Sequence, residues 1–194
     1  MLRLAVAVAV ALAACGYDDL GEEAIAVETD LVKACPIPSI DDIPGHESVF
    51  YRCAEAHADA GRGCGDDGYL LGYGTRYAER FYRQTRPRMS PRGQRWIDDV
   101  LVCLQRDLRD SIDSTTRCDD IRTIAFDSHP ACYIEAGFCS LPILDVLNVL
   151  WTIDAREWFG SDAFRQAART AAGCSQQYAS AIHFFFGDLG GSDR

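Results

Sequence analysis

Apolar residues recur at three- and four-residue spacing along most of the chain, which is the pattern of amphipathic helices. The widest such face runs from Trp96 to Ile112. Its apolar positions are Trp96, Ile97, Val100, Leu101, Cys103, Leu104, Leu108 and Ile112, and the polar positions expected to face away are Asp98, Asp99, Arg106, Asp107, Arg109 and Asp110. Ser90 followed by Pro91 predicts the N-cap and the first turn of this helix.

The same spacing predicts helices on both sides of this segment. Before it, we expect one helix over 47–59 and another that opens after Gly68, separated by a glycine turn over 61–65. Their expected inward faces are Val49, Phe50, Cys53 and Ala56 or His57 in the first, and Leu70, Tyr73 or Gly74, Tyr77 and Phe81 in the second. After it, a helix over 116–127 has the expected inward residues Ile121, Ile124 and Ala125.

The second half of the chain is also predicted to be helical. Ser128-His129-Pro130 is expected to break the chain and restart a short helix through Ala136, because proline lacks the backbone N–H that a helix interior needs. The nearly all-apolar run over 141–151 predicts a central helix, followed by helices over 163–174 and 178–185. Since no run alternates in the manner of a strand, the expected fold is all-α.

The first fourteen residues have the features of a secretory signal peptide. Arg3 precedes an apolar run that is shorter than the roughly twenty residues a membrane-spanning helix needs. The run ends Leu12-Ala13-Ala14-Cys15, which resembles a bacterial lipobox, where the cysteine receives a lipid and becomes the mature N-terminus. Ordinary cleavage after Ala13 also fits these small residues. Lipidation of Cys15 leaves eight of the nine cysteines to pair, which favours the lipoprotein interpretation.

Residues 15–30 are expected to tether the domain to a membrane. They contain few large apolar side chains. Their acidic residues are Asp18, Asp19, Glu22, Glu23, Glu28 and Asp30, which lack the spacing and the central glycine of an EF-hand loop. The helical domain is then expected over 31–188, with a disordered tail over 189–194.

The net charge excludes one class of partner. The chain carries 29 acidic and 19 basic residues, for a formal net charge of -10. Such a surface repels nucleic acid, so no nucleic-acid partner is expected. It repels anionic lipid as well, so attachment to a membrane is expected only through the lipid anchor.

The eight cysteines after Cys15 predict disulfides. They are Cys35, Cys53, Cys64, Cys103, Cys118, Cys132, Cys139 and Cys174. No two of them have the close C-x2–4-C spacing of a zinc site, and secreted chains form disulfides in oxidising compartments. Eight cysteines allow many pairings, so the spacing alone does not connect them. The expected fold class is therefore a disulfide-stapled all-α helical bundle.

No catalytic or cofactor motif is present. The chain has no G-x-S-x-G, no P-loop and no H-E-x-x-H. The segment from His129 to Tyr133 is faintly similar to the catalytic helix of secreted phospholipases A2, but Pro130 replaces the aspartate that should follow the histidine. A metal site is conceivable from Glu55, His57, Asp59, Asp66 and Asp67, although a solvated acidic face is the simpler interpretation. We therefore expect no enzyme activity, metal or cofactor.

Several spacings match a known pattern when taken together. Cys118, Cys132, Cys139 and Cys174 follow one another at intervals of fourteen, seven and thirty-five positions, with Tyr133 directly after Cys132. Upstream stand Cys64-x-x-Asp67-Gly68 before a helix and Gly93-x-x-Trp96 leading to Cys103. This combination resembles the stanniocalcin family of secreted animal glycoprotein hormones, with its Cys-x-x-Asp-Gly start, its Gly-x-x-Phe helix leading to a cysteine and its Cys-Tyr-x5-Cys step. The resemblance covers about Cys35 to Cys174.

The resemblance implies a disulfide pairing. The implied bridges are Cys35–Cys53, Cys64–Cys118, Cys103–Cys132 and Cys139–Cys174. The family has a further bridge, one cysteine of which aligns with Tyr73 here, and its partner position between Cys53 and Cys64 also lacks a cysteine. Both cysteines are thus absent together, as the loss of a whole bridge requires.

The resemblance also implies a non-enzymatic function. Stanniocalcins are linked to calcium and phosphate homeostasis, and they bind and inhibit a large secreted metalloproteinase. This chain lacks an N-x-[ST] glycan acceptor, and its lipobox indicates a bacterium, so the fold is expected to transfer better than the endocrine physiology. We expect a secreted, lipid-anchored, outward-facing envelope protein that binds a secreted or envelope protein, for example a metalloproteinase-like one.

Two other function classes stay open on the sequence. The acidic surface is compatible with a calcium-binding envelope protein, and an enzyme with an unrecognised site is the third class. Candidate contact residues for a binding module are the aromatic residues of 178–186 and those around Trp158 and Phe159, which could equally belong to the core.

Overall fold

The helices form an elongated antiparallel bundle. A computed structural model describes residues 30–154, 168–170 and 172–174, and these contain helices and no strand. The elements are η1 (Ile40–Asp42), α1 (Val49–Gly61), η2 (Tyr69–Thr75), α2 (Arg76–Arg80), η3 (Phe81–Thr85), η4 (Arg86–Arg88), α3 (Pro91–Ser111), α4 (Cys118–Glu135), η5 (Phe138–Ser140) and α5 (Ile143–Thr152). With four disulfides present, the predicted disulfide-stapled all-α fold is confirmed for these residues.

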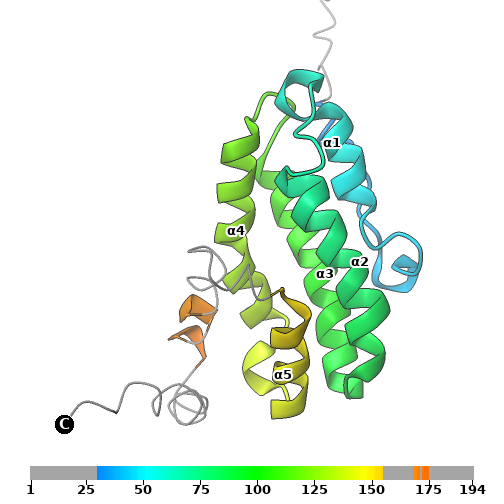
Figure 1. Cartoon of the computed structure of the whole chain (residues 1–194), viewed down its shortest axis with the longest axis vertical. Helices are drawn as coiled ribbons and strands as arrows, with labels where there is room; N and C mark the ends of the chain where they lie inside the picture. Colours follow the sequence, from blue (N-terminus) through cyan, green and yellow to red (C-terminus); the bar gives the residue numbers. More distant parts are fainter. Residues whose placement is uncertain (1–29, 155–167, 171, 175–194) are drawn as a thin grey trace, which may run out of the picture.

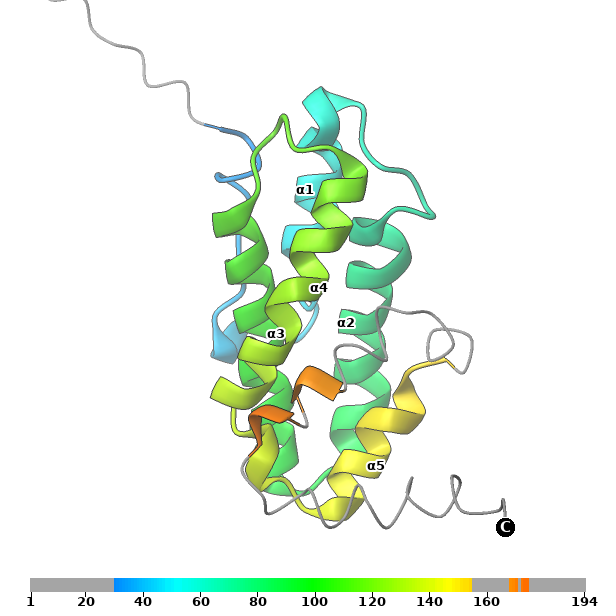
Figure 2. The ribbon, with the colours of Figure 1, turned by 90° about the vertical axis from the view of Figure 1, so that its left-hand side faces the viewer.

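Four helical segments lie side by side along the long axis, and α5 lies at one end of them (Figures 1 and 2). The first is α1, and the second is the continuous series from η2 to η4. The other two are α3 and α4, which pack most extensively against each other. The described chain begins at the opposite end from α5, where the Asp30 carboxylate accepts a hydrogen bond of 2.8 Å from the Ser114 N–H in the α3–α4 loop.

The start of α3 is as the sequence predicts. The Ser90 hydroxyl accepts a hydrogen bond of 3.2 Å from the Gly93 N–H, and Pro91 occupies the first turn. The predicted apolar face is largely buried, but the prediction for Asp98 is wrong. Asp98 is buried rather than solvated, because the Arg86 guanidinium reaches both of its carboxylate oxygens at 2.7 and 2.8 Å.

The predicted inward face of α1 is partly wrong. Its buried residues are Phe50, Tyr51, Ala54 and Ala58, whereas Val49, Cys53 and His57 are half-buried and Ala56 is exposed. The difference arises because Cys53 is bonded to Cys35 in residues 30–48, which we name the lead-in segment, and does not point to the other helices. In the next segment Leu70, Gly74 and Tyr77 are buried as predicted, and a Cβ at Gly74 would lie only 2.7 Å from the Tyr51 ring.

The predicted break at Ser128-His129-Pro130 is wrong, because α4 continues through Pro130 to Glu135. Two side chains bind the carbonyl oxygen of Ala125 in the preceding turn. The Ser128 hydroxyl donates to it at 2.8 Å and the His129 Nδ1–H donates at 2.5 Å. The α4 helix also packs extensively on α3, which favours its continuation although Pro130 donates no backbone N–H.

The prediction that the apolar run over 141–151 forms a central helix is also wrong. The helix exists, but only one side of α5 is buried, through Asp145, Val149 and Thr152. Leu144 is 70% exposed and Trp151 is 77% exposed. The predicted helix over 163–174 lies outside the described residues except for 168–170 and 172–174, which are helical or end a helix, and the one over 178–185 lies wholly outside them.

In the part of the chain that the structure describes, no helix combines the length and the apolar character needed to cross a bilayer.

Candidate functional site

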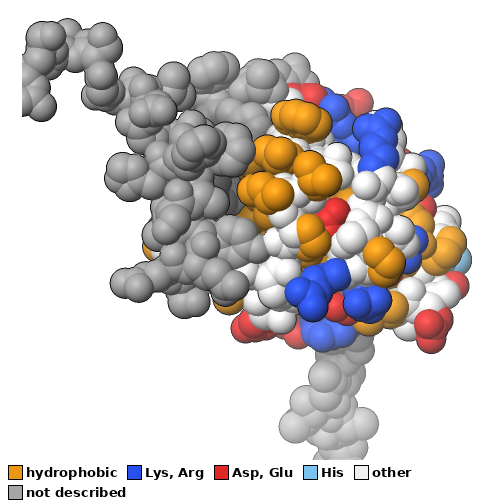
Figure 3. Space-filling view, turned by 90° about the horizontal axis from the view of Figure 1, so that it is seen from below, with side chains coloured by type: hydrophobic (Ala, Val, Ile, Leu, Met, Phe, Trp, Pro, Cys, Tyr) orange, Lys and Arg blue, Asp and Glu red, His pale blue; other side chains and the backbone are white. Residues whose placement is uncertain are grey.

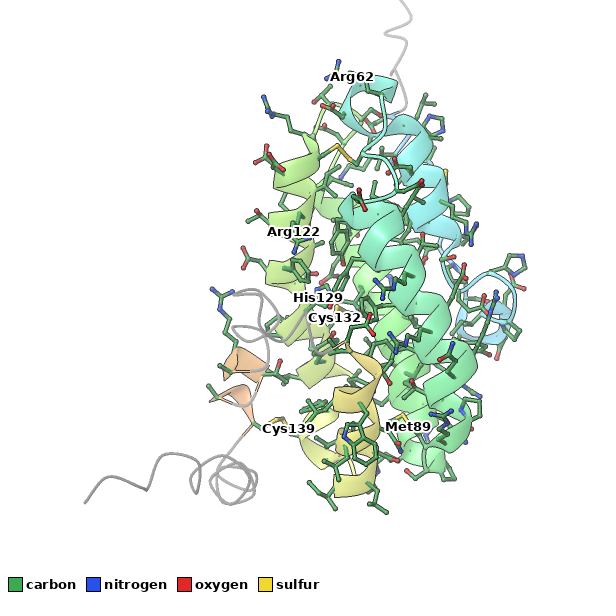
Figure 4. The ribbon with its side chains drawn as sticks, viewed as in Figure 1. Arg62, Met89, Arg122, His129, Cys132 and Cys139 are labelled. Carbon is green, nitrogen blue, oxygen red and sulfur yellow. A yellow bond between two sulfur atoms is a disulfide. The ribbon has the colours of Figure 1, made fainter. Side chains whose placement is uncertain are left out.

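The four bridges join the residues before α1 to α1, the glycine turn to the start of α4, α3 to α4, and η5 to Cys174. They are Cys35–Cys53, Cys64–Cys118, Cys103–Cys132 and Cys139–Cys174, with Cα–Cα distances of 5.7, 5.5, 5.7 and 5.2 Å. These are the same four pairs that the stanniocalcin resemblance implies. Cys103–Cys132 joins α3 to α4 near the middle of the bundle, where Figure 4 labels Cys132 beside His129. The proposed lipid site, Cys15, lies outside the described residues.

The α5 helix is held on the bundle by a buried carboxylate. Asp145 is 3% exposed and accepts hydrogen bonds from the N–H and the hydroxyl of Ser90, at 2.9 and 2.5 Å. Gly93 leaves room for this contact, because a Cβ there would lie 2.5 Å from Asp145 Oδ2. One polar residue within an apolar run therefore attaches α5 to the start of α3.

The opposite side of α5 presents apolar side chains to solvent. Ile143 is 43% exposed, beside the strongly exposed Leu144 and Trp151. Leu144 and Trp151 are seven residues apart and therefore share one helix face. Figure 3 shows hydrophobic side chains gathered on this end of the molecule. We name Ile143, Leu144 and Trp151 of α5 the distal patch, because α5 lies at the opposite end of the bundle from the start of the described chain (Figure 1).

Two arginines are bonded to α5 or to the residues just before it. The backbone carbonyl of Arg88 accepts a hydrogen bond of 3.4 Å from the Asn148 side chain of α5, and the Arg92 guanidinium donates to the Ser140 carbonyl at 2.9 Å. Both arginines are exposed. Exposed apolar side chains and two exposed arginines therefore occur on neighbouring segments at this end of the bundle, in a chain whose net charge is strongly negative.

An aromatic cluster fills the centre of the bundle around a cavity of about 40 Å³. Its lining includes Tyr51, Tyr69, Tyr73, Trp96, His129 and Tyr133. The volume suits only a few water molecules, so it does not indicate a site for a drug-sized ligand. Burial raises the pKa values of Tyr51, Tyr69 and Tyr133, which favours their neutral forms.

His129 belongs to this cluster. Its ring contacts Tyr69, Tyr73, Phe126 and Tyr133. Burial lowers its pKa from 6.5 to about 4, although the hydrogen bond with the Ala125 carbonyl acts in the opposite direction. His129 is therefore a neutral core residue at pH 7, rather than a histidine placed at an open cleft.

A second depression lies between α3 and α4, over the Cys103–Cys132 bridge. This groove of about 260 Å³ is lined by Ile40, Asp99, Val102, Cys103, Arg106, Cys132, Glu135 and Ala136. Asp107 lies close by, with its Oδ2 3.5 Å from Cys132 Sγ. Burial, and then the charges of Glu135 and Asp110, raise the pKa of Asp107. Close carboxylates alone do not define an ion site, so we assign no ligand to this groove.

Of the acidic residues considered for a metal, Glu55 and Asp59 make other contacts, and Asp66 and Asp67 are exposed. Glu55 Oε1 accepts hydrogen bonds of 2.6 Å from the N–H groups of Cys64 and Gly65, which fixes the glycine turn. Asp59 is paired with Arg62 at 2.9 Å. His57 lies beside the Cys35–Cys53 bridge. The potential ligand groups that converge within the described residues each contain two cysteines already joined in a disulfide.

Sequence reasoning missed the distal patch. The run over 141–151 is apolar on nearly every side, so its composition did not show which side would be buried. The one available signal was Asp145, since a carboxylate within such a run needs a buried partner and therefore marks the inward side. Ser90 was identified as an N-cap, but its second role as that partner was not.

Comparison of the chain with protein-family models, with curated protein sequences and with solved structures gives no match.

Proposed function

We propose that this chain is a non-enzymatic binding module, lipid-anchored at Cys15 on the outer side of a bacterial envelope, that contacts a partner protein through the distal patch. The observation that carries the proposal is the exposure of Leu144 and Trp151 at the end of the bundle farthest from Asp30. Exposed large apolar residues gathered on one face are typical of protein contact surfaces. A tether that enters at Asp30 would hold this end away from the membrane.

The disulfide framework supports this function. Cys139, in η5 just before α5, is bonded to Cys174, and Cys103–Cys132 joins α3 to α4. Such cross-links restrict the segments that they join, which lowers the cost of ordering a surface for a partner. Disulfides persist in oxidising compartments outside the cytosol, which agrees with secretion.

We further propose membership of a stanniocalcin-like family. The pairing of all eight cysteines agrees with it, and two motif glycines have structural roles. A Cβ at Gly68 would lie 2.5 Å from Cys64 Cβ, and Gly93 admits Asp145. The glycine of each motif therefore lies where a larger residue would collide with a neighbouring side chain. On this proposal the partner is a secreted or envelope protein, with a metalloproteinase-like protein as the first candidate.

Photo-crosslinking in the native host tests the proposed function. A benzophenone amino acid replaces Leu144 in one variant and the exposed Arg62, at the other end of the bundle, in a control variant (Figure 4). We expect a defined crosslinked envelope or secreted protein from position 144 and none from position 62. Absence of a crosslink at 144, or the same products from both positions, would contradict the proposal.

A further inference from the structure

The positive charge beside the distal patch determines what kind of partner it fits. We propose that the patch binds an acidic, apolar segment of a partner protein; this inference rests on the proposed function and specifies the chemistry of its partner. The argument depends on how the nearby arginines are paired.

Arginines are concentrated in the segment that precedes and begins α3. Residues 76–95 contain seven arginines and one acidic residue, Glu79. Several of these arginines are neutralised by carboxylates from elsewhere. Arg76 and Arg80 pair with Asp154, Arg83 pairs with Glu47, and Arg86 pairs with Asp98.

Arg88 and Arg92 differ from these. The Arg88 carbonyl is bonded to Asn148 of α5, and the Arg92 guanidinium is bonded to Ser140, just before α5. Both are exposed, and neither forms an ion pair with any residue that the structure describes. The acidic residue of α5 does not compensate them, because Asp145 is buried against Ser90. The patch therefore offers apolar contact and two uncompensated positive charges, which a carboxylate-bearing partner would complement.

The same charges argue against two other occupants. A second copy of this chain would bring Arg88 and Arg92 against the same arginines across a two-fold axis, where like charges repel. An anionic membrane would attract the arginines, but the patch lies at the end opposite Asp30, where the proposed tether enters, and the whole chain carries a net charge of -10.

Binding of two matched peptides tests the inference. The probes are an amphipathic helical peptide with leucines on one face and glutamates on the other, and its counterpart with lysine in place of each glutamate. Fluorescence anisotropy with the full mature chain carrying Cys15→Ala should show about tenfold tighter binding of the glutamate probe. The double variant Arg88→Glu/Arg92→Glu should remove or reverse this preference. A control, Arg106→Glu/Arg117→Glu, alters two exposed arginines away from α5 and should preserve it.

The outcomes separate this inference from the proposed function. Equal binding of both probes, or a preference unaffected at Arg88 and Arg92, overturns the acidic partner but leaves crosslinking at position 144 intact. Failure of that crosslinking overturns the proposed function itself.

Three other results would assign the patch to a different occupant. A dimer in light scattering that Leu144→Ser dissociates assigns the patch to a second copy of this chain. Cosedimentation with anionic vesicles that requires the two arginines assigns it to a membrane. If the glutamate peptide binds only to a chain truncated after Cys174, the occupant of the patch is the chain's own residues 175–194. Each of these three results overturns the inference.

Discussion

Mild acidification should destabilise the fold through His129. The ring lies in the aromatic cluster, and its pKa is about 4 in the folded chain against an ordinary value of 6.5. Above pH 6.5 the ring is neutral in both the folded and the unfolded chain. Between pH 6.5 and 4 the unfolded chain binds a proton that the folded chain does not. The free energy of unfolding should therefore fall as the pH falls through this window.

The size of the effect follows from the shift. Each pKa unit corresponds to about 1.4 kcal/mol, so the whole window amounts to about 3 kcal/mol, and the interval from pH 6.5 to 5 to about 2 kcal/mol. Carboxylates change the free energy of unfolding mainly at lower pH, where they become protonated. Asp154, for example, has its pKa held below 3.8 chiefly by the hydrogen bond from Arg80, so its contribution is lost below about pH 5.

Urea denaturation followed by circular dichroism, from pH 7.5 to 5, measures this effect. His129→Phe keeps an aromatic ring at the site and removes its titration, so the difference between wild type and variant isolates the histidine from other ionisable groups. We expect wild type to lose about 2 kcal/mol more than the variant over this interval. His129→Gln provides a second non-titrating variant should the phenylalanine fit poorly. Parallel pH profiles for wild type and both variants would refute a buried, neutral His129.

Three further predictions address the bridges, the α5 attachment and the anchor. Replacing Cys139 and Cys174 with alanine removes a bridge of sequence separation 35 and should lower the free energy of unfolding by about 4 kcal/mol, measured by urea denaturation; an unchanged midpoint would contradict it. Gly93→Ala places a Cβ 2.5 Å from Asp145 Oδ2 and should lower the free energy of unfolding by about 1–3 kcal/mol in the same assay. An equal or higher stability would show that α5 can shift to make room for the added Cβ. Protein from its own host should have the mass of the chain from Cys15 plus lipid, and Cys15→Ala should release a folded protein from membranes; a mature chain that starts at Ala14 without added mass would exclude lipidation.

Local signals in the sequence determined most of the helices. Ser90 and Pro91 start α3 by bonding and conformation within one turn, and the Trp96–Ile112 face needs only a neighbouring surface to cover it. The glycine turn was equally predictable, because Gly61, Gly63 and Gly65 all adopt positive φ. These features depend on a few adjacent residues, so the sequence by itself specifies them.

Tertiary contacts decided the features that sequence patterns mispredicted. Pro130 remains within α4, which packs extensively on α3, whereas the local preference of proline is to end a helix. Asp98 is buried because Arg86, from a different helical segment, lies within reach. In both cases the deciding contact comes from another helical segment.

The candidate site shows the same division most clearly. The sequence predicts an apolar helix over 141–151, but its hydrophobicity on nearly every side leaves undetermined which side is buried. The contact between Asp145 and Ser90 selects the buried side, and the other side becomes the distal patch. A helix can bury its whole circumference only when neighbours surround it, and α5 lies at the end of the bundle (Figure 2). The position of α5 in the fold, and not its composition, therefore exposes Leu144 and Trp151.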